Sequence, residues 1–500
     1  MAKYIMGFDV GSSSIKASLL EIDTGKFVAS AASPKKELEI LAPKPGWAEQ
    51  DPAVWWRHLR ATAAEIGSVE GVDLKEVEAV GISYQMHGLV CVDQDHKLLR
   101  PAIIWCDSRA VQTGEKAFSD LGQDLCLSRL LNSPGNFTAS KLKWVKDNEP
   151  EVFARISKIM LPGDYISFLL TGEITTTPSG LSEAIIWDFR ENGLAGFLLD
   201  YYGIAQELIP KVVPTFSVQG ELTGAAAQEL GLRPGIKLSY RAGDQPNNAL
   251  SLNVLNPGEI AATAGTSGVV YGVGEDTAFD SLSRVNTFVH VNHSREAHRY
   301  GILLCINGTA ILNSWLKHNV MTAGRAASSY DEMNALAAEA PIGSEGLLIL
   351  PFGNGAERTL ENRNIGASIH GLDFNKHSQA HLLRAAQEGI VFALNYGMEI
   401  MQGMGVEPEK VRAGHANMFL SPLFTKAFAT VTGAGVELYN TDGAQGAARG
   451  AGIGAGIFTA RDAFTGLKTV RVTEPNAKIS APYREAYGRW LELLETILKQ

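Results

Sequence analysis

The sequence predicts an α/β protein of two domains with a cleft between them. Five hundred residues are too many for one compact hydrophobic core, so more than one domain is expected. Apolar runs of strand length alternate along the chain with longer amphipathic segments, which is typical of the α/β class. Two hairpins of the same design stand about half a chain apart. We therefore expect an internal duplication, with domains at residues 1–250 and 251–500.

The first half opens with strands. Residues 3–10 and 15–22 are rich in β-branched and aromatic residues and flank the turn "GSSS". A helix is predicted after Asp51, because Asp is a favoured cap and Pro52 fits the first helical position. A further strand is predicted at "VEAVGISY", residues 77–84. Residues 138–172 are predicted to form a helix, a strand and a second helix.

The second half begins with a hairpin of the same kind. "GEIAATAG" and "SGVVYGV" are apolar strands around the turn "GTS". The longest predicted helix covers residues 378–404, with Ser378 as its cap. One face of that helix is apolar: Leu382, Leu383, Ala386, Ile390 and Val391.

The bulk composition excludes several classes of protein. A net charge of −10 and a pI near 5.6 argue against a nucleic-acid binder. No membrane span is expected, since no window approaches 18 uninterrupted apolar residues. The beginning of the sequence lacks signal-peptide features, so a cytoplasmic protein is expected. The cysteines lack metal-binding spacing, so we expect neither zinc nor disulfides: Cys91, Cys106, Cys126 and Cys305.

Asp244, in "YRAGDQPNNALSL", permits two interpretations. Asp is a favoured helix cap, and a Pro two residues later fits the first helical turn. The alternative is a carboxylate that performs chemistry. The helix dipole is expected to favour the ionised carboxylate, which is the state that a general base requires. The two interpretations are therefore compatible.

Two small-residue turns could bind phosphate groups. In "FDVGSSSIK" the backbone N–H groups and hydroxyls are suited to an anion, and Asp9 could hold a hydrated Mg²⁺ against it. The candidate anion contacts in this turn are Ser12, Ser13, Ser14 and Lys16. The second turn, "TAGTSG", offers Gly265, Thr266 and Ser267. Neither is a GxxxxGK[ST] loop, and each alone is equally consistent with a plain β-turn.

A third candidate is a loop suited to a hydroxyl-bearing ligand. In "SYQMHGLVCVD", Gln85, Met86 and His87 follow a predicted strand, where ligand contacts are common. Histidine can hydrogen-bond a hydroxyl in either direction, and methionine supplies an apolar flank. Trp47 in "GWAEQDP" stands beside polar planar groups, as in sugar sites. The alternatives are a structural histidine in a turn and a tryptophan packed in the core.

Two glycine-containing segments lie near the end of the chain. "AGHANMFLSPLFTKAF", residues 413–428, is predicted to form a strand end, a loop and a helix, where Gly414 would admit a nucleotide. "DGAQGAARGAGIGAG" lacks the dinucleotide-binding pattern G-x-G-x-x-G after a strand. It is therefore predicted to be a close-packed helix of small residues, and a nucleotide-cofactor oxidoreductase is not expected.

Taken in order, these motifs resemble the FGGY carbohydrate kinases over nearly the whole chain. Within that family, "QMHG" and "WAEQDP" are most similar to the xylulokinases. The segments that carry the resemblance are "GFDVGSSSIK", "GWAEQDPAVWW", "GISYQMHGLV", "RPAIIWCDSR", "FTASKLKWV", "LPGDYISFLLTGE", "AGDQPNNAL", "TAGTSGVVY", "LPFGNGAER" and "DGAQGAARGAG".

The resemblance implies two actin-like, ribonuclease-H-like ATPase domains with an active-site cleft between them. Residues 1–250 would bind the sugar and residues 251–500 the nucleotide. The implied reaction is the Mg·ATP-dependent phosphorylation of D-xylulose on O5, with ATP and Mg²⁺ as cofactors. A homodimer is a family-level expectation.

The resemblance also implies roles for individual residues. Asp244 would be the catalytic base, and it would share the metal with Asp9. Sugar contacts would come from Gln85, Met86, His87 and Trp47. Phosphate contacts would come from Ser12, Ser13, Ser14, Lys16, Gly265, Thr266 and Ser267. Gly414 and Asn417 would lie at the adenosine end.

Three departures leave details open. The usual triple-glycine loop is "AGHAN" here, with Ala413 and His415 in place of glycines. "GSSS" replaces a commoner Gly-Thr-Ser turn, and "DQPNNA" differs from the usual "DNAAGA". Alternative functions are kinases for L-ribulose, L-fuculose, gluconate or glycerol. A more distant alternative is an actin- or Hsp70-like nucleotide switch, which has no use for a sugar loop such as "QMHG".

Overall fold

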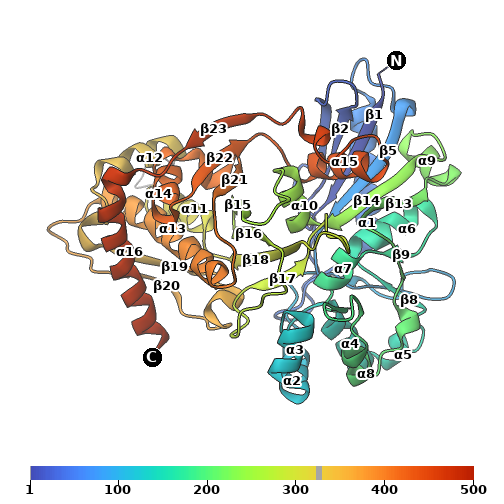
Figure 1. The fold of residues 1–500 in the computed structure, drawn as a ribbon, viewed down its shortest axis with the longest axis horizontal. Helices are drawn as coiled ribbons and strands as arrows, with labels where there is room; N and C mark the ends of the chain where they lie inside the picture. The colour runs from blue at the N-terminus through green and yellow to red at the C-terminus, as the bar shows by residue number, and fades with distance from the viewer. Residues whose placement is uncertain (1, 322–328, 500) are drawn as a thin grey trace. The chain divides into compact units, whose positions relative to one another are not determined.

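The chain forms two compact units in a computed structural model that describes residues 2–321 and 329–499. Unit 1 comprises Met1–Asn253, Phe288–Tyr300 and Thr441–Leu467, and unit 2 comprises the rest. The chain first leaves unit 1 three residues after the predicted boundary at residue 250. Phe288–Tyr300 and Thr441–Leu467 also belong to unit 1, so a single boundary in the sequence does not separate the two units. Helices and strands carry the labels of Figure 1.

Unit 1 is built on a six-stranded mixed sheet with the order β13-β14-β5-β1-β2-β3. Strands β1, β5 and β14 are parallel, while β2, β3 and β13 run antiparallel to their neighbours. Central strands of this kind are buried on both faces, which explains the nearly continuous apolar run of β1. The bounds are β1 Tyr4–Val10, β2 Ile15–Glu21, β3 Phe27–Ser33, β5 Val77–Tyr84, β13 Phe216–Glu221 and β14 Lys237–Gly243.

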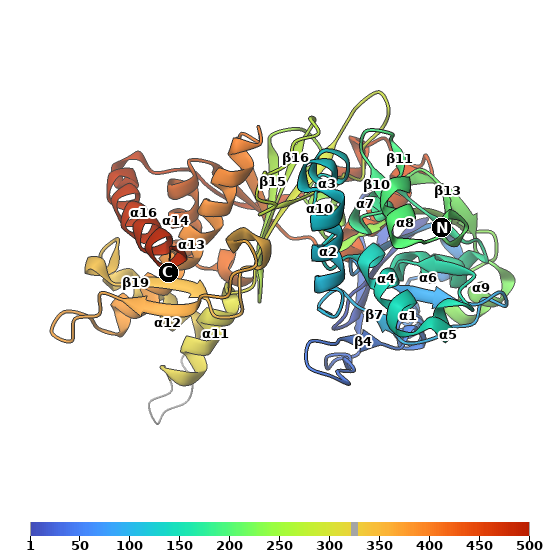
Figure 2. The same ribbon diagram turned by 90° about the horizontal axis from the view of Figure 1, so that it is seen from below.

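Small sheets and helices complete unit 1, and Figure 2 shows α1, α6 and α9 close together on it. The paired short strands are β4 Glu49–Gln50 with β7 Ala102–Ile103, β6 Val90–Val92 with β8 Lys158–Met160, β9 Thr175–Thr176 with β12 Lys211–Val212, and β10 Trp187–Asp188 with β11 Gly193–Leu194. The helices are α1 Pro52–Gly67, α2 Val111–Leu121, α3 Gln123–Leu130, α4 Thr138–Asn148, α5 Pro150–Phe153, α6 Pro162–Thr171, α7 Pro178–Glu183, α8 Gly196–Tyr202, α9 Gly224–Leu230, α10 Asp244–Ser251 and α15 Gly443–Gly454.

Helix α15 is the close-packed helix of small residues that the sequence predicts. It lies against the blue strands of the first sheet in Figure 1. A Cβ atom on Gly7 would stand 2.0 Å from the carbonyl oxygen of Ala444, and one on Gly81 would stand 2.1 Å from that of Ala447. Glycine on the strands and alanine on the helix therefore let the two backbones approach closely.

Unit 2 repeats the design with a seven-stranded sheet, in the order β17-β18-β16-β15-β21-β22-β23. Strands β15, β21 and β22 are parallel, and β16 and β23 are antiparallel to β15 and β22. The bounds are β15 Glu259–Ala264, β16 Gly268–Gly274, β17 Asn286–Val289, β18 Tyr300–Ile306, β21 Lys410–Gly414, β22 Gly435–Tyr439 and β23 Thr469–Thr473. A separate hairpin joins β19 Leu348–Phe352 to β20 Gly366–His370.

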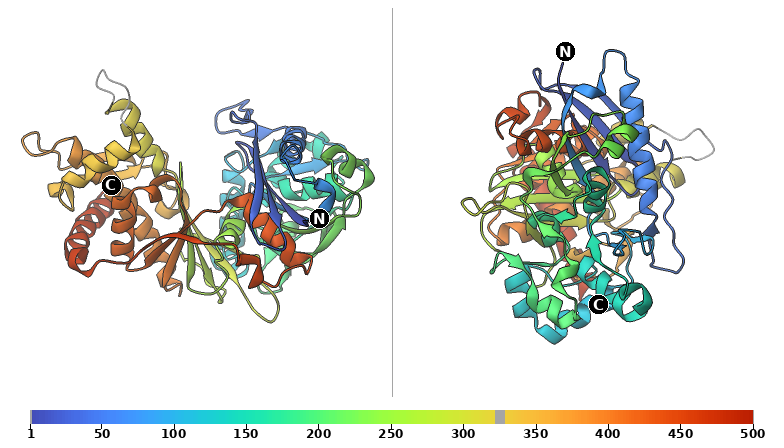
Figure 3. Two further views of the ribbon diagram at one scale, coloured as in Figure 1. Left: turned by 90° about the horizontal axis from the view of Figure 1, so that it is seen from above. Right: turned by 90° about the vertical axis from the view of Figure 1, so that its right-hand side faces the viewer.

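The core of unit 2 is helical on one side. The helices are α11 Ala310–Asn319, α12 Tyr330–Glu339, α13 Gln379–Gly403, α14 Pro422–Thr432 and α16 Ala477–Leu498. Helix α13 is buried over most of its length, and α14 packs against both α13 and α16. The dark red C-terminal helix lies beside the orange helices in Figure 3. Its Trp490 donates from the indole N–H to the Ile349 carbonyl at 2.9 Å, which fixes α16 on β19.

The two sheets confirm the predicted duplication. In each sheet, the first strand of the opening hairpin has two strands parallel to it on its other side, and an antiparallel strand lies at that edge. The helices predicted after Asp51 and Ser378 begin at Pro52 and Gln379, as their caps indicate. Among the described residues, no helix is long and apolar enough to span a membrane.

Candidate functional site

The carboxyl ends of three parallel strands meet at one edge of the unit 1 sheet. Asp9 of β1 pairs with Ser83 of β5, and Gly243 of β14 pairs with Tyr84. Because the strands run in the same direction, the segments that follow them emerge at the same edge. Three predicted site elements therefore converge there: the turn after β1, the "QMHG" loop after β5 and Asp244 after β14.

Asp9 is held at the start of helix α15. The Ser83 hydroxyl donates to Asp9 Oδ1 at 2.8 Å. A Cβ atom on Gly443, the first residue of α15, would lie 2.6 Å from Asp9 Oδ2, so only glycine leaves room for the carboxylate. The adjacent Asp442 caps α15 and accepts a hydrogen bond from the Gln445 N–H at 2.9 Å. Two carboxylates thus share the positive end of this helix.

Asp244 is the first residue of α10, and the cap position belongs to Gly243. The prediction that Asp244 itself caps the helix was therefore wrong by one residue. The glycine is needed for space, because a Cβ atom there would lie 2.5 Å from Met86 Cγ. Met86 of the "QMHG" loop therefore lies beside the residue that precedes Asp244.

The charge state of Asp244 differs from the expectation based on the helix dipole. Burial, followed by the negative charge of Asp9, raises the pKa of the Asp244 carboxyl to about 7, although hydrogen bonds from Gln245 act in the opposite direction. Burial also raises the pKa of Asp9, with a smaller contribution from Asp442, against the lowering effect of Lys16 and Ser83. Desolvation and like charges outweigh the helix terminus here.

This pair of carboxylates suits a divalent cation. Mg²⁺ commonly takes one or two carboxylates and completes its shell with water and phosphate oxygens. Asp9 and Asp244 repel each other in the absence of a cation, and a bound cation would relieve that repulsion. Within residues 2–321 and 329–499, no group of three His, Cys, Asp or Glu side chains could enclose a metal ion by itself. The residues therefore fit a metal shared with a phosphate ligand.

His87 is fixed firmly within the "QMHG" loop. Its backbone N–H donates to Glu183 Oε2 at 2.7 Å, and its backbone carbonyl accepts from the Lys141 ammonium group at 2.8 Å. The imidazole packs edge-on against Phe137, with ring centroids 4.7 Å apart, and lies 5.6 Å from the ring of Phe288. The side chain is held in place by these contacts, as a ligand-binding side chain must be.

Gln85 connects the "QMHG" loop to the turn after β1 through Gln50. The Gln85 amide donates to Gln50 Oε1 at 3.1 Å, and Gln50 Nε2 donates to the Ser12 carbonyl at 2.7 Å. Both glutamine side chains are buried. Gln85 therefore supports the two loops from within the protein.

Trp105 contacts the turn after β1 from the solvent side. Its indole N–H donates to the Ser12 hydroxyl at 3.2 Å while 43% of the residue is exposed.

The turn after β1 is compact and partly open. The Gly11 N–H donates to the Ser14 carbonyl at 3.1 Å, and Ser13 is anchored through its carbonyl by the N–H of Leu38 at 2.8 Å. Ser13 and Lys16 are exposed, and Lys16 pairs with Asp9 across the hairpin. The turn thus presents a hydroxyl and a cation near the strand-end carboxylates.

Trp47 belongs to a neighbouring aromatic and ionic cluster. The Arg109 guanidinium lies 3.8 Å above its ring, and Trp144 packs edge-on at 5.2 Å. Arg109 in turn binds the buried carboxylate of Asp107, whose Oδ2 accepts from the Ala48 N–H at 2.6 Å. These contacts agree with the packed alternative for Trp47, and its predicted contact with sugar stays a prediction.

In unit 2, the turn between β15 and β16 is held from behind by the start of α11. The Thr309 hydroxyl donates to the Gly265 carbonyl at 2.6 Å, and the Ala310 N–H donates to the same oxygen at 2.8 Å. The Ser267 hydroxyl donates to Asn307 Oδ1 at 3.1 Å. A Cβ atom on Gly265 would lie 3.3 Å from Asn417 Nδ2, so these two predicted nucleotide residues are neighbours.

Gly414, at the end of β21, faces open space. A Cβ atom there would meet no atom within 4 Å. The next residue, His415, continues the backbone pairing by donating its N–H to the Tyr439 carbonyl at 2.7 Å, and Ala413 is fully buried. The two departures from a triple-glycine loop thus lie on either side of the open position. The arrangement leaves room for a flat ligand beside Gly414.

Four residues at the unit 1 site were missed in the sequence analysis. Ser83 and Trp105 lie in segments that were quoted for the family resemblance, but no role was predicted for either residue. Asp442 precedes the small-residue helix, for which only a packing role was predicted. Glu183 stands in "LSEAIIWD", which gave no recognisable signal. One clue was available in the sequence. Trp105 directly follows the short apolar segment of residues 102–104, where ligand contacts are common.

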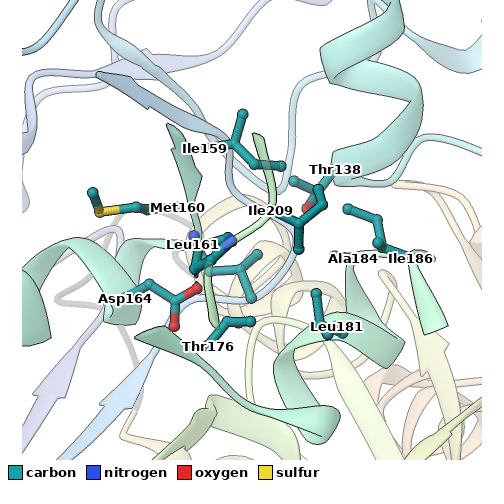
Figure 4. Close-up of a pocket in the computed structure, with 11 residues that line it drawn as sticks. Thr138, Ile159, Met160, Leu161, Asp164, Thr176, Leu181, Ala184, Ile186 and Ile209 are labelled. Atoms are coloured by element: carbon teal, nitrogen blue, oxygen red, sulfur yellow. Dashed lines mark hydrogen bonds between the residues drawn. The ribbon is translucent and has the colours of Figure 1, made fainter. Parts of the chain in front are cut away.

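A cavity in unit 1 is too small to be the ligand site. Its volume is about 10 Å³, which corresponds to about one water molecule. Figure 4 shows a mainly aliphatic lining, including Ile159, Leu161 and Leu181, with Asp164 and Thr176 among the polar members. The cavity is therefore a packing feature, and the strand-end carboxylates remain the candidate site.

Comparisons with known proteins agree with this geometry. Residues 4–251 match the sequence profile of the N-terminal domain of the FGGY family of carbohydrate kinases, and residues 260–457 match that of its C-terminal domain. A xylulose kinase of Bacillus subtilis is 30% identical over 407 residues, which cover 81% of this chain and 78% of the relative.

Solved structures show the same fold. A crystal structure described as a xyloylose kinase from Brucella ovis superposes with a TM-score of 0.90 at 27% identity and covers 99% of both chains. A glycerol kinase from Plasmodium falciparum, solved with ADP, superposes with a TM-score of 0.87 at 21% identity, covering 100% of this chain and 99% of the other. The second similarity concerns the fold alone.

Proposed function

The chain belongs to the FGGY family of carbohydrate kinases, and we propose that it phosphorylates D-xylulose with ATP to give D-xylulose 5-phosphate. The enzyme is a phosphotransferase with an alcohol group as acceptor. The choice of xylulose is supported by relatives described as xylulose kinases, at 30% identity in Bacillus subtilis and 28% in Escherichia coli. A kinase that draws on cellular ATP is expected in the cytoplasm.

One observation carries the proposed chemistry: Asp244 stands at a shared strand edge with Asp9, and the residue before it contacts Met86. A carboxylate, a second carboxylate suited to a metal and a loop suited to hydroxyl groups are thus adjacent. This combination supports phosphoryl transfer to a sugar hydroxyl more than it supports a binding function alone.

In the proposed reaction, Asp244 orients the terminal hydroxyl of the sugar and accepts its proton. The hydroxyl oxygen forms a bond to the γ-phosphorus as the bond to the ADP oxygen breaks, so ADP leaves with that electron pair. Such a transition state is loose, and catalysis consists mainly of positioning and charge neutralisation. A carboxyl with a pKa of about 7 can both accept the proton and release it afterwards.

The remaining residues are proposed to bind substrates. Met86 and His87 would contact the sugar, and contacts are also proposed for Gln85 and Trp47. Asp9 and Asp244 would hold Mg²⁺, which neutralises charge on the transferring phosphoryl group. Phosphate contacts are proposed for Ser12, Ser13, Ser14, Lys16, Gly265, Thr266 and Ser267. Gly414 and Asn417 are proposed at the adenosine end.

A panel of acceptors tests the proposal. ADP formation by the purified protein would be measured with D-xylulose, L-ribulose, L-fuculose, gluconate and glycerol at equal concentrations. We expect the highest kcat/KM with D-xylulose, and phosphorylation on O5 in the product. A higher kcat/KM with another acceptor would replace xylulose while retaining the kinase. Sugar-independent ATP hydrolysis that no acceptor stimulates would support the nucleotide-switch alternative instead.

A further inference from the structure

Glu183 is a buried carboxyl group that the proposed reaction does not use. It is the last residue of α7, and only 1% of the residue is exposed to solvent. A glutamate is rarely buried unless it is paired or hydrogen-bonded, because desolvation of a carboxylate is costly. Its partners therefore indicate what it does.

The first partner is His87, which Glu183 contacts through two different oxygen atoms. The carboxyl Oε2 accepts from the His87 backbone N–H at 2.7 Å, and the Glu183 carbonyl lies 2.9 Å from His87 Nδ1. Since a carbonyl can only accept, Nδ1 must carry the proton in this contact, and neutral imidazole then has its acceptor lone pair on Nε2. The side chain of Glu183 thus holds the backbone of His87, whereas the tautomer is fixed by the Glu183 backbone carbonyl, which any residue at this position would supply.

The backbone of His87 needs this support. Its φ is +60°, in the left-handed region that residues other than Gly adopt uncommonly, although His, Asn and Asp do so more often than the rest. Strained backbone of this kind persists where the surroundings fix it, and it is concentrated at functional sites. The hydrogen bond from the His87 N–H to the carboxyl group is one such constraint.

The second partner is the strand end that carries the base. A Cβ atom on Gly243 would lie 3.1 Å from Glu183 Oε1 and 2.5 Å from Met86 Cγ. Glu183 is therefore packed between His87 on one side and the Met86–Gly243 contact on the other. Burial, with the nearby charges of Asp244 and Asp164, raises the pKa of this carboxyl well above its ordinary value.

We propose that Glu183 is a positioning residue for sugar binding, which orients His87 and packs Met86 beside the base. The inference rests on the proposed function, in which Met86 and His87 contact the sugar. It adds a determinant of sugar affinity and selectivity that lies behind the contact residues. The nucleotide is not involved, so a defect in Glu183 should concern the sugar alone.

The test uses Glu183→Ala and Glu183→Gln, with Glu388→Gln as the matched control. Glu388 is a glutamate buried to the same degree in unit 2, where it binds Arg384. We expect Glu183→Ala to raise the KM for xylulose about tenfold or more, the effect of losing a well-made hydrogen bond, with the KM for ATP unchanged. Gln keeps an acceptor oxygen, so Glu183→Gln should raise the KM for xylulose by only about threefold.

Two further measurements separate this inference from the proposed function. Amide NMR of His87 gives a readout without any turnover: because Glu183→Ala removes the acceptor Oε2, the hydrogen-exchange protection of the His87 N–H should fall in this variant and be largely kept in Glu183→Gln. In the double variant Glu183→Ala/His87→Ala, the sugar KM should be no higher than with His87→Ala alone, because one residue acts through the other.

Several results would overturn the inference. They are an unchanged xylulose KM in folded Glu183→Ala, an equal rise in the KM for both substrates, or the same effect in Glu388→Gln. If Glu183→Ala does not fold, an unaltered xylulose KM with a weakened His87 N–H hydrogen bond in Glu183→Gln counts against it. If the wild type phosphorylates no sugar, the proposed function fails, whereas the amide measurement still decides whether the Glu183 side chain holds His87.

Discussion

At the scale of single residues, the charge of Asp244 is set by its surroundings. The sequence correctly located a carboxylate at the start of a helix, but the expected bias of the helix dipole towards its ionised form is outweighed. Burial and the charge of Asp9 raise its pKa to about 7. Asp9 is distant in sequence, and it reaches Asp244 only because β1, β5 and β14 are parallel neighbours. No local pattern around Asp244 contains that information.

The raised pKa predicts how stability depends on pH. The unfolded state releases the Asp244 proton near pH 3.8 and the metal-free folded state near pH 7, so ionisation of this group opposes folding as the pH rises between these values. The resulting cost is at most about 4 kcal/mol, at about 1.36 kcal/mol per pH unit. Asp244→Asn, without Mg²⁺, should therefore be stabilised relative to the wild type at pH 8 and much less so at pH 5.

Thermal unfolding at several pH values checks this prediction. Asp280→Asn is the matched control: burial acts to raise the pKa of that carboxyl, but hydrogen bonds donated by Arg284 bring it below its ordinary value. Asp280→Asn should lose stability at pH 8, in the opposite direction. An Asp244→Asn variant that is less stable than the wild type at pH 8 would show that the carboxylate is favourably ionised in the fold.

At the scale of elements, α15 connects packing to the site. Its small residues pack on Gly7 and Gly81, and its first residue leaves room for Asp9. The sequence predicted the packing from the run of Gly and Ala, whereas the contact with Asp9 could not be seen in it. Hairpins, caps and periodic helices were predictable because each is encoded within a few neighbouring residues. The interaction between Glu183 and His87 spans 96 residues and carried no signal.

Gly81→Val tests the role of this close approach. A Cβ atom at this position would stand 2.1 Å from a backbone carbonyl of α15, which cannot move without shifting the helix. We expect a loss of about 1–3 kcal/mol or more of unfolding free energy in urea, together with reduced kcat. The control is Gly224→Ala, where a Cβ atom meets nothing within 4 Å. Equal stability of Gly81→Val and the wild type would contradict the packing described.

At the scale of the whole molecule, the duplicated sheet explains why the site residues recur at hairpins and strand ends. Each unit supplies a small-residue turn after its first strand, and the strand end further along the sheet is open at Gly414 in unit 2 but packed against Met86 at Gly243 in unit 1. Two such halves were predictable from the hairpins alone. The assignment of Thr441–Leu467 to unit 1 was not, because it depends on contacts between distant parts of the chain. The preferred sugar likewise depends on side-chain positions that no single motif specifies.

The central claim is that Asp244 is the base in transfer of a phosphoryl group from ATP to D-xylulose. The most direct test is the kcat for xylulose-dependent ADP formation, at saturating substrates, in wild type, Asp244→Asn and Asp244→Ala. We expect both variants to remain folded and to lose about 10²–10⁴-fold in kcat, the usual contribution of a positioned base. A folded variant within about tenfold of the wild type, or about 1.4 kcal/mol of barrier, would contradict the account.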